Sequence, residues 1–433
     1  MNMELQQTEI GAFPATWVVD RVDAAFDIQQ GKQVSKKNRD GEHQRPFLRT
    51  KNIFWNRLEL TDLDQMHFSE AEQSRLELCT NDLLVCEGGS IGRTALWNNE
   101  VDGCLYQNHL HRLRVKGYKA DPQFGVYWLW YAFDVAKLYF GRGNVTTIPN
   151  LSQSKLAELP MALPPLPEQK KIAHILSTVQ RAIESQERII QTTTELKRAL
   201  MQKLFTEGLR NEPQKQSVIG PIPESWVVVE LEAKAESFQY GTSVKCGYNV
   251  AGRPVLRIPN VVGGSVDLAD LKFGNPKTNE LEKLRLQTGD LLFVRTNGVK
   301  ENAGRCSKFN GEIEDCYFAS YLIRVRLDPS VLNPDFLNEY SRTEIGTSFL
   351  SGKAIRTADG KFNINSGTLK TMLVPIPEID EQNEIADSLA LVDVRVANAA
   401  AKKTQLKDLF RTLLQEFMTA RIRVNNLDMN ISN

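Results

Sequence analysis

The 433-residue sequence lacks several features that would place it in a class at once. No stretch approaches the roughly 18 consecutive apolar residues that a membrane-spanning helix needs. The polar first ten residues have neither the basic start nor the apolar core of a signal peptide. The six cysteines are scattered without a C-x-x-C pair, which disfavours a disulfide framework and structural zinc. We therefore expect a cytoplasmic protein that holds no metal of its own.

Motifs of catalysis are also missing. The sequence has no G-x-x-x-x-G-K-[ST] phosphate loop, no G-x-S-x-G elbow, no H-E-x-x-H and no clear nuclease pattern of acids. The glycine-rich segment 88–92 follows an apolar run, so a turn is favoured over a phosphate cradle, and a backbone contact to DNA phosphate is compatible with both. His109 and His111 could bind a metal only with distant partners, and a strand with both histidines on one face is the simpler interpretation. These absences indicate a chain that is not an enzyme.

An excess of charge of one sign is absent too, because 53 Lys and Arg residues balance 53 Asp and Glu residues. Taken over the whole chain, this balance argues against a nucleic-acid binder. Locally the charge is uneven, since residues 32–57 carry eight basic side chains opposed only by Asp40 and Glu42, with aromatic residues interleaved. Arg, Lys and Asn side chains hold phosphates and read base edges, so we interpret the basic segments as DNA-contacting, with a solvated surface as the alternative.

The candidate DNA-binding residues fall into one group in each half of the chain. In the first half they are Lys32, Lys36, Lys37, Arg39, Arg45, Arg49 and Lys51, and Arg57 ends the basic segment. In the second half they are Lys245, Arg253, Arg257, Arg295, Asn297, Lys300, Arg305, Lys353, Arg356 and Lys361. The segments 32–57 and 241–257 share few residues, which is expected if the two halves read different sequences.

An internal duplication organises the chain. The segment Ile10–Val19 recurs as Ile219–Val228, an offset of 209 residues (219 − 10), and Asn81–Val85 recurs as Gly289–Phe293. Arg114-Val115 matches Arg324-Val325 in this alignment. The Glu168-Gln169 pair recurs as Glu381-Gln382, by which point the offset is 213 (381 − 168). A drift of a few residues indicates loop insertions within one shared fold.

Each half divides into a mixed part and a long helical part. Residues 1–165 and 213–376 show short apolar runs between turn residues and a few helical stretches, which predicts two α+β domains. Residues 166–212 and 377–433 are predicted to hold one long helix each. Between Pro167 and Gly208 there is no internal Pro or Gly, and Pro and Gly at these two ends are good start and stop signals.

Apolar residues in the two predicted helices recur at coiled-coil spacing. The predicted seam consists of Ile172, Leu176, Val179, Ile183, Ile190, Leu196, Leu200 and Leu204 in the first helix, and Ile385, Leu389, Val392, Val396, Lys403, Leu409, Leu413 and Phe417 in the second. Only Lys403 is not apolar. Because no insertion separates the two series, we expect these helices, each roughly 60 Å long at 1.5 Å per residue, to pack on each other. Two lobes joined by such a helical rod would suit a long target with two separated sites, such as DNA.

At this point the sequence resembles a known family, the DNA specificity subunit of type I restriction–modification systems. The resemblance rests on the segment Pro164–Ala173 and its repeat Pro375–Ala386, each proline-rich and each ending in E-Q-x-x-I-A before a long helix. The repeated starts Pro14–Val22 and Pro223–Leu231, each with a tryptophan, are also typical of the family. One departure is an apparent insertion, Glu378–Asp380, before the second Glu-Gln pair, which would shift the entry of that helix.

This resemblance, which spans essentially the whole chain, implies a fold and a division of labour. Each α+β part would be a target recognition domain that reads one half of a split, asymmetric DNA sequence, and the two helices would form an antiparallel coiled coil that sets the spacing. The chain itself would be non-catalytic and bind no cofactor. Two modification subunits would bind S-adenosylmethionine and methylate adenine, and two restriction subunits would add ATP- and Mg-dependent translocation and cleavage.

Two other functions remain open on the sequence. One is a standalone or type II-like DNA methyltransferase or nuclease component, which would bind S-adenosylmethionine or Mg²⁺ as an isolated chain. The other is a protein–protein scaffold without DNA contact, in which reversing the charge of Lys32 and Arg49 would leave every partner function intact.

Overall fold

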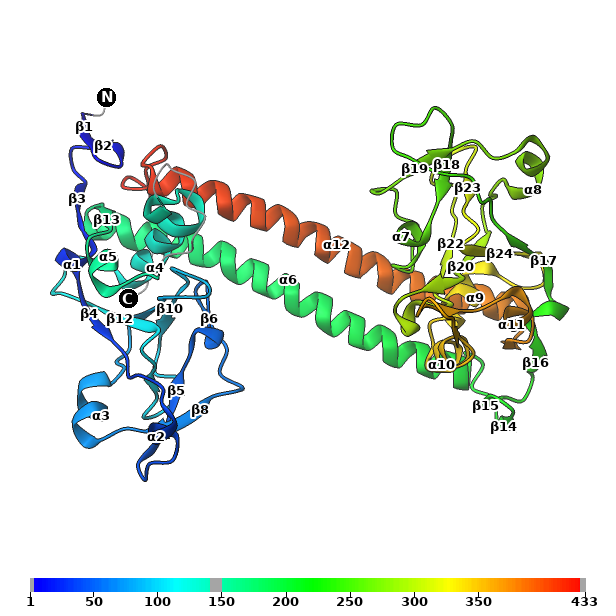
Figure 1. Ribbon diagram of the computed structural model, residues 1–433, viewed down its shortest axis with the longest axis horizontal. Helices are drawn as coiled ribbons and strands as arrows, with labels where there is room; N and C mark the ends of the chain where they lie inside the picture. The colour runs from blue at the N-terminus through cyan, green and yellow to red at the C-terminus, as the bar shows by residue number, and fades with distance from the viewer. Residues whose placement is uncertain (1–3, 141–149, 429–433) are drawn as a thin grey trace. The chain divides into compact units, whose positions relative to one another are not determined.

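Two long helices organise the fold, α6 (Leu166–Glu207) and α12 (Ile379–Met418) (Figure 1). The computed structural model describes residues 4–140 and 150–428. The contacts between residues divide the chain into unit 1, residues 1–187 with 401–433, and unit 2, residues 188–400. Each helix therefore contributes one part to each unit. No helix of the described part is long and apolar enough to cross a membrane.

The α+β lobe of unit 1 is built on two small sheets. The strand order of one is β10-β9-β12-β4 and that of the other is β11-β5-β8. The first sheet comprises β4 (Phe26–Gln30), β9 (Asp82–Cys86), β10 (Thr94–Trp97) and β12 (Leu110–Val115), and the second comprises β5 (Gln44–Leu48), β8 (Asp64–His67) and β11 (Leu105–Tyr106). Paired strands are β1 (Leu5–Thr8) with β2 (Gly11–Pro14), β3 (Val18–Arg21) with β13 (Pro160–Leu163), and β6 (Ile53–Phe54) with β7 (Arg57–Leu58). The short helices are α1 (Val22–Ala25), α2 (Lys36–Arg39), α3 (Glu70–Leu76), α4 (Pro122–Trp130) and α5 (Gln153–Ala157).

The lobe of unit 2 repeats this plan. Its first sheet has the order β17-β24-β20-β22, from β17 (Ala235–Tyr240), β20 (Leu291–Val294), β22 (Cys306–Lys308) and β24 (Leu322–Leu327). Its second sheet is β19-β18-β23, from β18 (Arg253–Leu256), β19 (Lys272–Gly274) and β23 (Tyr317–Phe318), and a third is β21-β26-β25, from β21 (Thr296–Asn297), β25 (Ile355–Arg356) and β26 (Phe362–Asn363). Pairs are β14 (Gln214–Ser217) with β15 (Gly220–Pro223) and β16 (Val227–Glu230) with β27 (Leu373–Ile376). The helices are α7 (Ile258–Val261), α8 (Leu281–Leu284), α9 (Pro334–Tyr340), α10 (Glu344–Gly352) and α11 (Ser366–Lys370).

The predicted α+β class and the internal repeat are confirmed, with one change in the alignment of the two halves. Strand register places Leu113 beside Leu83 and Val325 beside Leu291, so Arg114 corresponds to Arg326 and not to Arg324. Both arginines make the same bidentate pair, Arg114 with Asp82 at 2.7 and 2.6 Å and Arg326 with Asp290 at 2.7 Å for each bond. The match Arg114 with Arg324 was wrong because the segment between the paired strands is longer in the second lobe, which the alignment did not take into account.

The two helices pair within each unit, and the direction of pairing is antiparallel. In unit 1, Ile172 and Leu176 near the start of α6 share a core with Leu414 and Phe417 near the end of α12. In unit 2, Leu204 near the end of α6 shares a core with Ile385 and Leu389 near the start of α12. Ion pairs accompany both contacts, with Glu187 3.3 Å from Lys403 and Lys197 2.7 Å from Asp393. Lys403, which had interrupted the predicted seam, thus has a partner on α6.

One predicted position in each helix is not part of the seam. Leu196 is 58% exposed and Leu409 is 45% exposed, whereas the next residues, Lys197 and Phe410, face inward. Leu196 and Leu409 are equivalent residues (409 − 196 = 213), so the error has one cause. The predicted series left the heptad here to take the apolar Leu196, six residues after Ile190, whereas a step of seven gives Lys197 (190 + 7 = 197) and, in the second helix, Phe410 (403 + 7 = 410).

The repeated Glu-Gln pair joins each lobe to the start of its long helix. Buried Gln169 accepts a hydrogen bond from the Asp121 amide at 2.8 Å and donates to the carbonyls of Pro164 and Lys119 at 2.8 and 3.3 Å. Buried Gln382 accepts one from the Asn333 amide at 2.9 Å, and it donates to the carbonyl oxygens of Pro377 and Val331.

These bonds also show that the second motif contains no insertion. Pro164 and Pro377 occupy the same place, the strands β13 and β27 end three residues before Leu166 and Ile379, and the two helices begin at those equivalent residues (379 − 166 = 213). The expected shift of the second helix entry was therefore wrong. It came from aligning the prolines by identity when the structure aligns the Glu-Gln pairs.

Replacing the buried glutamine should loosen the lobe from its helix. We expect Gln169→Leu to lower the free energy of unfolding of unit 1 by about 2–3 kcal/mol, because a buried amide and two carbonyls lose their partner. Urea unfolding followed by tryptophan fluorescence measures this change. Gln191→Leu is the matched control, since Gln191 is exposed on the same helix and donates to Glu195 at 3.1 Å. Equal effects of the two substitutions would contradict this role.

Candidate nucleic-acid interface

The basic segment of the first lobe separates into two kinds of cation. Lys36 and Arg39 on α2, and Arg45 on β5, are exposed, and no carboxylate of the described residues pairs with them. Ser35 caps α2, since its hydroxyl accepts a hydrogen bond from the Asn38 amide at 3.3 Å. Arg45 donates to the side chain of Gln73 at 3.1 Å, which orients its guanidinium but leaves its charge unopposed. The side chain of Lys37 lies outside the described residues.

The other predicted cations of this lobe are paired within the lobe. Lys32 is only 9% exposed, lies 2.6 Å from Glu72 and donates to the His67 carbonyl at 2.8 Å. Arg49 and Lys51 lie 2.5 and 2.6 Å from Asp64 and Asp62. The Arg49 guanidinium holds the pKa of the Asp64 carboxyl below its ordinary value. The carboxylates that neutralise these cations lie outside the basic segment, at residues 62–72.

One of the paired positions, Arg49, recurs in the second lobe as Arg257 and has the same structural role. The backbone amides of Arg49 and Arg257 donate to Asn52 and Asn260 at 2.8 and 2.9 Å. Each asparagine then donates to two backbone carbonyls further along its own loop. The two basic segments therefore share this hydrogen-bonded loop, although few of their residues are identical. We call the structure that the two lobes have in common the frame.

In the second lobe, tertiary structure joins two clusters that are about 60 residues apart in sequence. The sheet β21-β26-β25 pairs Asn297 and Arg356 with the same residue, Phe362. Lys300, Lys353 and Arg356 are exposed, and none has a carboxylate partner in the part of the chain that the structure describes. The Arg295 guanidinium lies 4.9 Å from the centre of the Tyr240 ring and donates to the Ser320 carbonyl at 3.2 Å. This sheet therefore gathers cations at one place of the lobe.

The remaining candidates of the second lobe are mostly engaged. Arg253 and Arg257 each lie 2.7 Å from a carboxylate, of Asp315 and Asp270 respectively. Lys361 pairs with Asp359 at 2.9 Å but stays half exposed. Arg305 is exposed and donates to the carbonyls of Glu301 and Val262. Asn297 accepts a hydrogen bond from the Val299 amide at 2.9 Å, and Lys245 is exposed.

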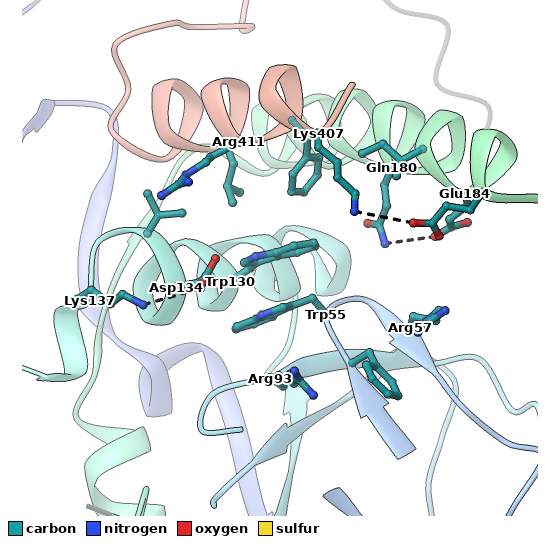
Figure 2. Close-up of a pocket in the computed structure, with 16 residues that line it drawn as sticks. Trp55, Arg57, Arg93, Trp130, Asp134, Lys137, Gln180, Glu184, Lys407 and Arg411 are labelled. Carbon is teal, nitrogen blue, oxygen red and sulfur yellow. Dashed lines mark hydrogen bonds and ion pairs between the residues drawn. The ribbon is translucent and has the colours of Figure 1, made fainter. Parts of the chain in front are cut away.

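A third group of cations lies at a cavity of about 660 Å³ in unit 1, where Arg57 from the end of the basic segment meets Arg93, which was not predicted (Figure 2). Arg57 and Arg93 both lie over the Phe54 ring, 4.8 and 5.3 Å from its centre. Beside them Trp55 stacks on Trp130 with the ring centres 5.2 Å apart. The β6–β7 hairpin brings Trp55 there through a turn at Asn56, whose positive φ of 50° asparagine tolerates well. Arg93 was missed because no other cation adjoins it in sequence.

The glycine-rich segment is a turn, as expected. It links β9 to β10, with the Gly92 amide bonded to the Cys86 carbonyl at 3.0 Å and the Arg93 amide to the Ser90 carbonyl at 3.1 Å. Gly92 has φ +79°, and a Cβ atom there would lie 2.2 Å from the Phe133 ring. Since these amides are bonded within the turn, they do not form a phosphate cradle.

The two histidines do not form a pair. His111 is buried on β12 with Nε2 2.9 Å from the Leu151 carbonyl, whereas His109 precedes the strand, is half exposed and lies 3.5 Å from Glu87. Because a carbonyl only accepts, Nε2 of His111 carries the proton and donates. Burial lowers the pKa of His111. Across the described ranges no group of three His, Cys, Asp or Glu side chains is placed to hold a metal ion.

Comparison with known proteins matches this arrangement to one family. A family model described as the type I restriction modification DNA specificity domain matches residues 14–195. The putative type I restriction enzyme MjaX specificity subunit of Methanocaldococcus jannaschii is 26% identical, over 97% of this chain and 96% of its own. The chain is thus similar to type I restriction enzyme specificity subunits over nearly its whole length.

Other similar proteins agree with this chain in length and fold. The type I restriction enzyme EcoKI specificity subunit of Escherichia coli K12 is 25% identical, over 97% of this chain and 93% of its own. The crystal structure of the type I restriction–modification S subunit from M. genitalium superposes with a TM-score of 0.56 at 16% identity, covering 93% of this chain and 96% of the other. The relatives thus span both lobes and both long helices.

The paired and unpaired cations of the first lobe should differ in their contribution to stability. We expect Lys32→Met to lower the free energy of unfolding of unit 1 by about 2–3 kcal/mol, because it leaves the Glu72 carboxylate without its cation. Lys36→Met should change it by less than about 0.5 kcal/mol, since Lys36 is a solvated surface side chain. Urea unfolding compares the two, and a larger loss for Lys36→Met would reverse the assignment.

Protonation of His111 should weaken the first lobe at mildly acidic pH. The unfolded imidazole titrates near 6.5, and the folded pKa lies lower, so the unfolded chain binds more protons below about pH 6.5. This contribution to stability is complete above that pH and is lost as the pH falls, because a second proton on buried Nδ1 would meet no acceptor among the described residues. Thermal unfolding between pH 5 and 8 measures it. His111→Gln should flatten the pH dependence and His109→Gln should leave it unchanged.

Proposed function

We propose that this chain is the subunit that recognises DNA for a type I restriction–modification complex, and that each lobe reads one half of a bipartite, asymmetric site. One observation carries the proposal. The two lobes share a frame, down to the Arg-to-Asn loop closure, but expose different cations on different elements. Two domains that recognise different half-sites need the same frame but different exposed cations, because contacts to phosphates and bases require cations that are not already paired.

The candidate contacts can be divided by the partners they already have. Lys36, Arg39 and Arg45 in the first lobe, and Lys245, Lys300, Lys353 and Arg356 in the second, are free to approach phosphate oxygens or base edges. For Lys32, Arg49, Lys51, Arg253, Arg257 and Lys361, DNA contact would compete with an existing ion pair. We therefore place the first contacts with DNA on the unpaired set.

In this proposal the chain works only as part of an assembly. Two modification subunits would bring S-adenosylmethionine and methylate adenine, two restriction subunits would bring ATP and Mg²⁺, and the long helices would carry the surfaces that hold them. A neutral total charge suits such a subunit, because partners that close around the duplex can supply much of the nonspecific phosphate contact. A standalone methyltransferase or nuclease is the less favoured alternative, and S-adenosylmethionine or Mg²⁺ binding by the isolated chain in calorimetry would support it.

The sheet β21-β26-β25 offers the sharpest test of DNA contact. In the complex with the modification subunits, we expect the triple variant Lys300→Ala, Lys353→Ala, Arg356→Ala to bind its methylated target more weakly. The slope of log affinity against log salt should fall in magnitude by about 2–3, at roughly 0.9 for each lost phosphate contact. Sequencing of methylated adenines in host DNA supplies the target, and gel shifts across a salt series measure the slope.

A matched variant removes the same charge from the same lobe. Lys234, Lys277 and Lys283 lie outside the sheet, and replacing all three by alanine should leave the slope unchanged. Equal slopes for both triple variants would place the DNA elsewhere on the lobe. Binding that ignores sequence at physiological salt would argue against the function itself.

A further inference from the structure

The place where each lobe rests on the paired helices differs in chemistry between the two units. We call the contact in unit 1 the aromatic junction, formed by Tyr127, Trp130, Trp55, Phe410 and Gln180. Phe410 of α12 packs on Tyr127 and Trp130 with ring centres 5.9 and 4.8 Å apart. The Tyr127 hydroxyl bonds Gln180 of α6 at 3.0 Å. Figure 2 shows Trp55 and Trp130 stacked beneath the helices that carry Lys407 and Gln180.

We call the contact in unit 2 the charged junction, formed by Glu339, Arg342, Lys197 and Asp393. Lys197 of α6 lies 2.9 Å from Glu339 of the lobe and 2.7 Å from Asp393 of α12. The side chains of Lys197 and Glu339 are 12% and 9% exposed, so this ion pair is largely shielded from water. Arg342 lies 3.2 Å from Glu339 and donates to the carbonyl of Gly264 in the adjoining turn.

The two junctions occupy equivalent positions in the duplicated fold. The helices α4 and α9 start from the equivalent caps Asp121 and Asn333 (333 − 121 = 212), so Tyr127 corresponds to Glu339 and Trp130 to Arg342. The Glu-Gln pairs set an offset of 213 between the long helices. The further correspondences are Gln180 with Asp393, Phe410 with Lys197 and, in the turn, Trp55-Asn56 with Gly263-Gly264.

The apolar residues around the junctions did not diverge in this way. Phe124 and Phe336 are both buried, as are Leu176 and Leu389, and Leu414 corresponds to Met201. Burial of these apolar side chains would therefore be similar if a lobe rested on the helix pair of the other unit. Hydrophobic contact alone does not distinguish the two docking places, because it is non-directional.

The junction residues do distinguish them. A second lobe placed on the helix pair of unit 1 would bury Glu339 against the Phe410 ring and the uncharged Gln180, without the lysine that neutralises it. A first lobe placed on the helix pair of unit 2 would offer Lys197 the Tyr127 ring in place of one of its two carboxylates. Arg342 would stay beside Glu339, but the second carboxylate oxygen would be buried without Lys197, and a desolvated carboxylate oxygen without a partner is unfavourable, so the mismatch at Glu339 decides the outcome.

We propose that the two junctions are mutually exclusive docking surfaces, so that each lobe accepts only its own helix pair. The partner they exclude is a second copy of this chain, whose equivalent helices present the same apolar seam. Lys197 and Glu339 are the positioning residues of this selection. The inference concerns assembly of the chain and stands whether or not the lobes bind DNA.

The full-length chain permits a direct test by making both junctions alike. The triple variant Lys197→Phe, Glu339→Tyr, Asp393→Gln gives unit 2 the aromatic chemistry of unit 1. The wild type, refolded from urea at micromolar concentration, should give one species in light scattering after gel filtration. The triple variant should refold to a mixture in which oligomers increase several-fold.

The single substitution Lys197→Phe distinguishes selective docking of the lobes from a general loss of stability. Lys197→Phe alone should lower the melting temperature of unit 2 by about 5–10 °C, because buried Glu339 loses one of its two cations and Asp393 loses its partner on α6. The triple variant should regain at least half of that loss. A triple variant no more stable than Lys197→Phe would overturn the matching of these residues.

A reciprocal variant and a surface control complete the test. Tyr127→Glu, Trp130→Arg, Gln180→Asp and Phe410→Lys together give unit 1 the charged chemistry, and oligomers should increase again. Lys203→Phe adds a ring at an exposed position of α6 and should not change the refolded species. One unchanged species for both converted chains would overturn the proposal, and so would oligomers from Lys203→Phe at the level of the triple variant.

Discussion

The rest of the structure depends on one constraint, which is that neither long helix can bury its apolar face alone. The apolar side chains at the start of α6 are buried against the end of α12, and those at the end of α6 are buried against the start of α12. Residues 401–433 therefore belong to the same unit as the first 187 residues. The contact between Glu168 and Arg423, 255 residues apart, shows how far this closure reaches along the chain. Antiparallel pairing within both units follows from this exchange of helix ends.

The buried Glu-Gln pairs convert the helix contact into a fixed attachment of each lobe. Gln169 and Gln382 satisfy a helix cap amide and two carbonyls of their lobes, so a lobe cannot slide along its helix without leaving buried polar groups unpaired. The acids beside them differ in partner. Glu168 accepts from Arg423 at 2.5 and 2.7 Å, whereas Glu381 accepts from the Trp226 indole at 3.0 Å and the Leu209 amide at 2.6 Å. The glutamine of the motif therefore makes the same bonds at both helix starts, whereas the partners of the glutamate differ.

The neutral total charge now has a structural explanation. Many cations of the lobes are neutralised by carboxylates of the same lobe, as Lys32 is by Glu72 and Arg257 by Asp270. The exposed cations that remain form smaller groups, on α2 and β5 in one lobe and on the sheet β21-β26-β25 in the other. Duplication thus preserved the ion pairs and hydrogen bonds that hold the frame, and the exposed cations and helix junctions diverged. Such a division lets one fold present two different surfaces.

Features that repeat along the chain could be predicted from the sequence by itself: the duplication, the α+β lobes, the two long helices and the family. Helical periodicity and repeated motifs depend on residues that are close in sequence, so they can be detected without a structure. The sequence could not decide which cations are free, because the acid that pairs with Arg49 or Arg253 lies 15 or 62 residues away. It also placed Leu196, and by repetition Leu409, in the seam, because the carboxylates that make Lys197 an inward residue, Glu339 and Asp393, lie far along the chain. Charge pairing and the choice of helix face depend on residues distant in sequence, and only tertiary structure brings those residues together.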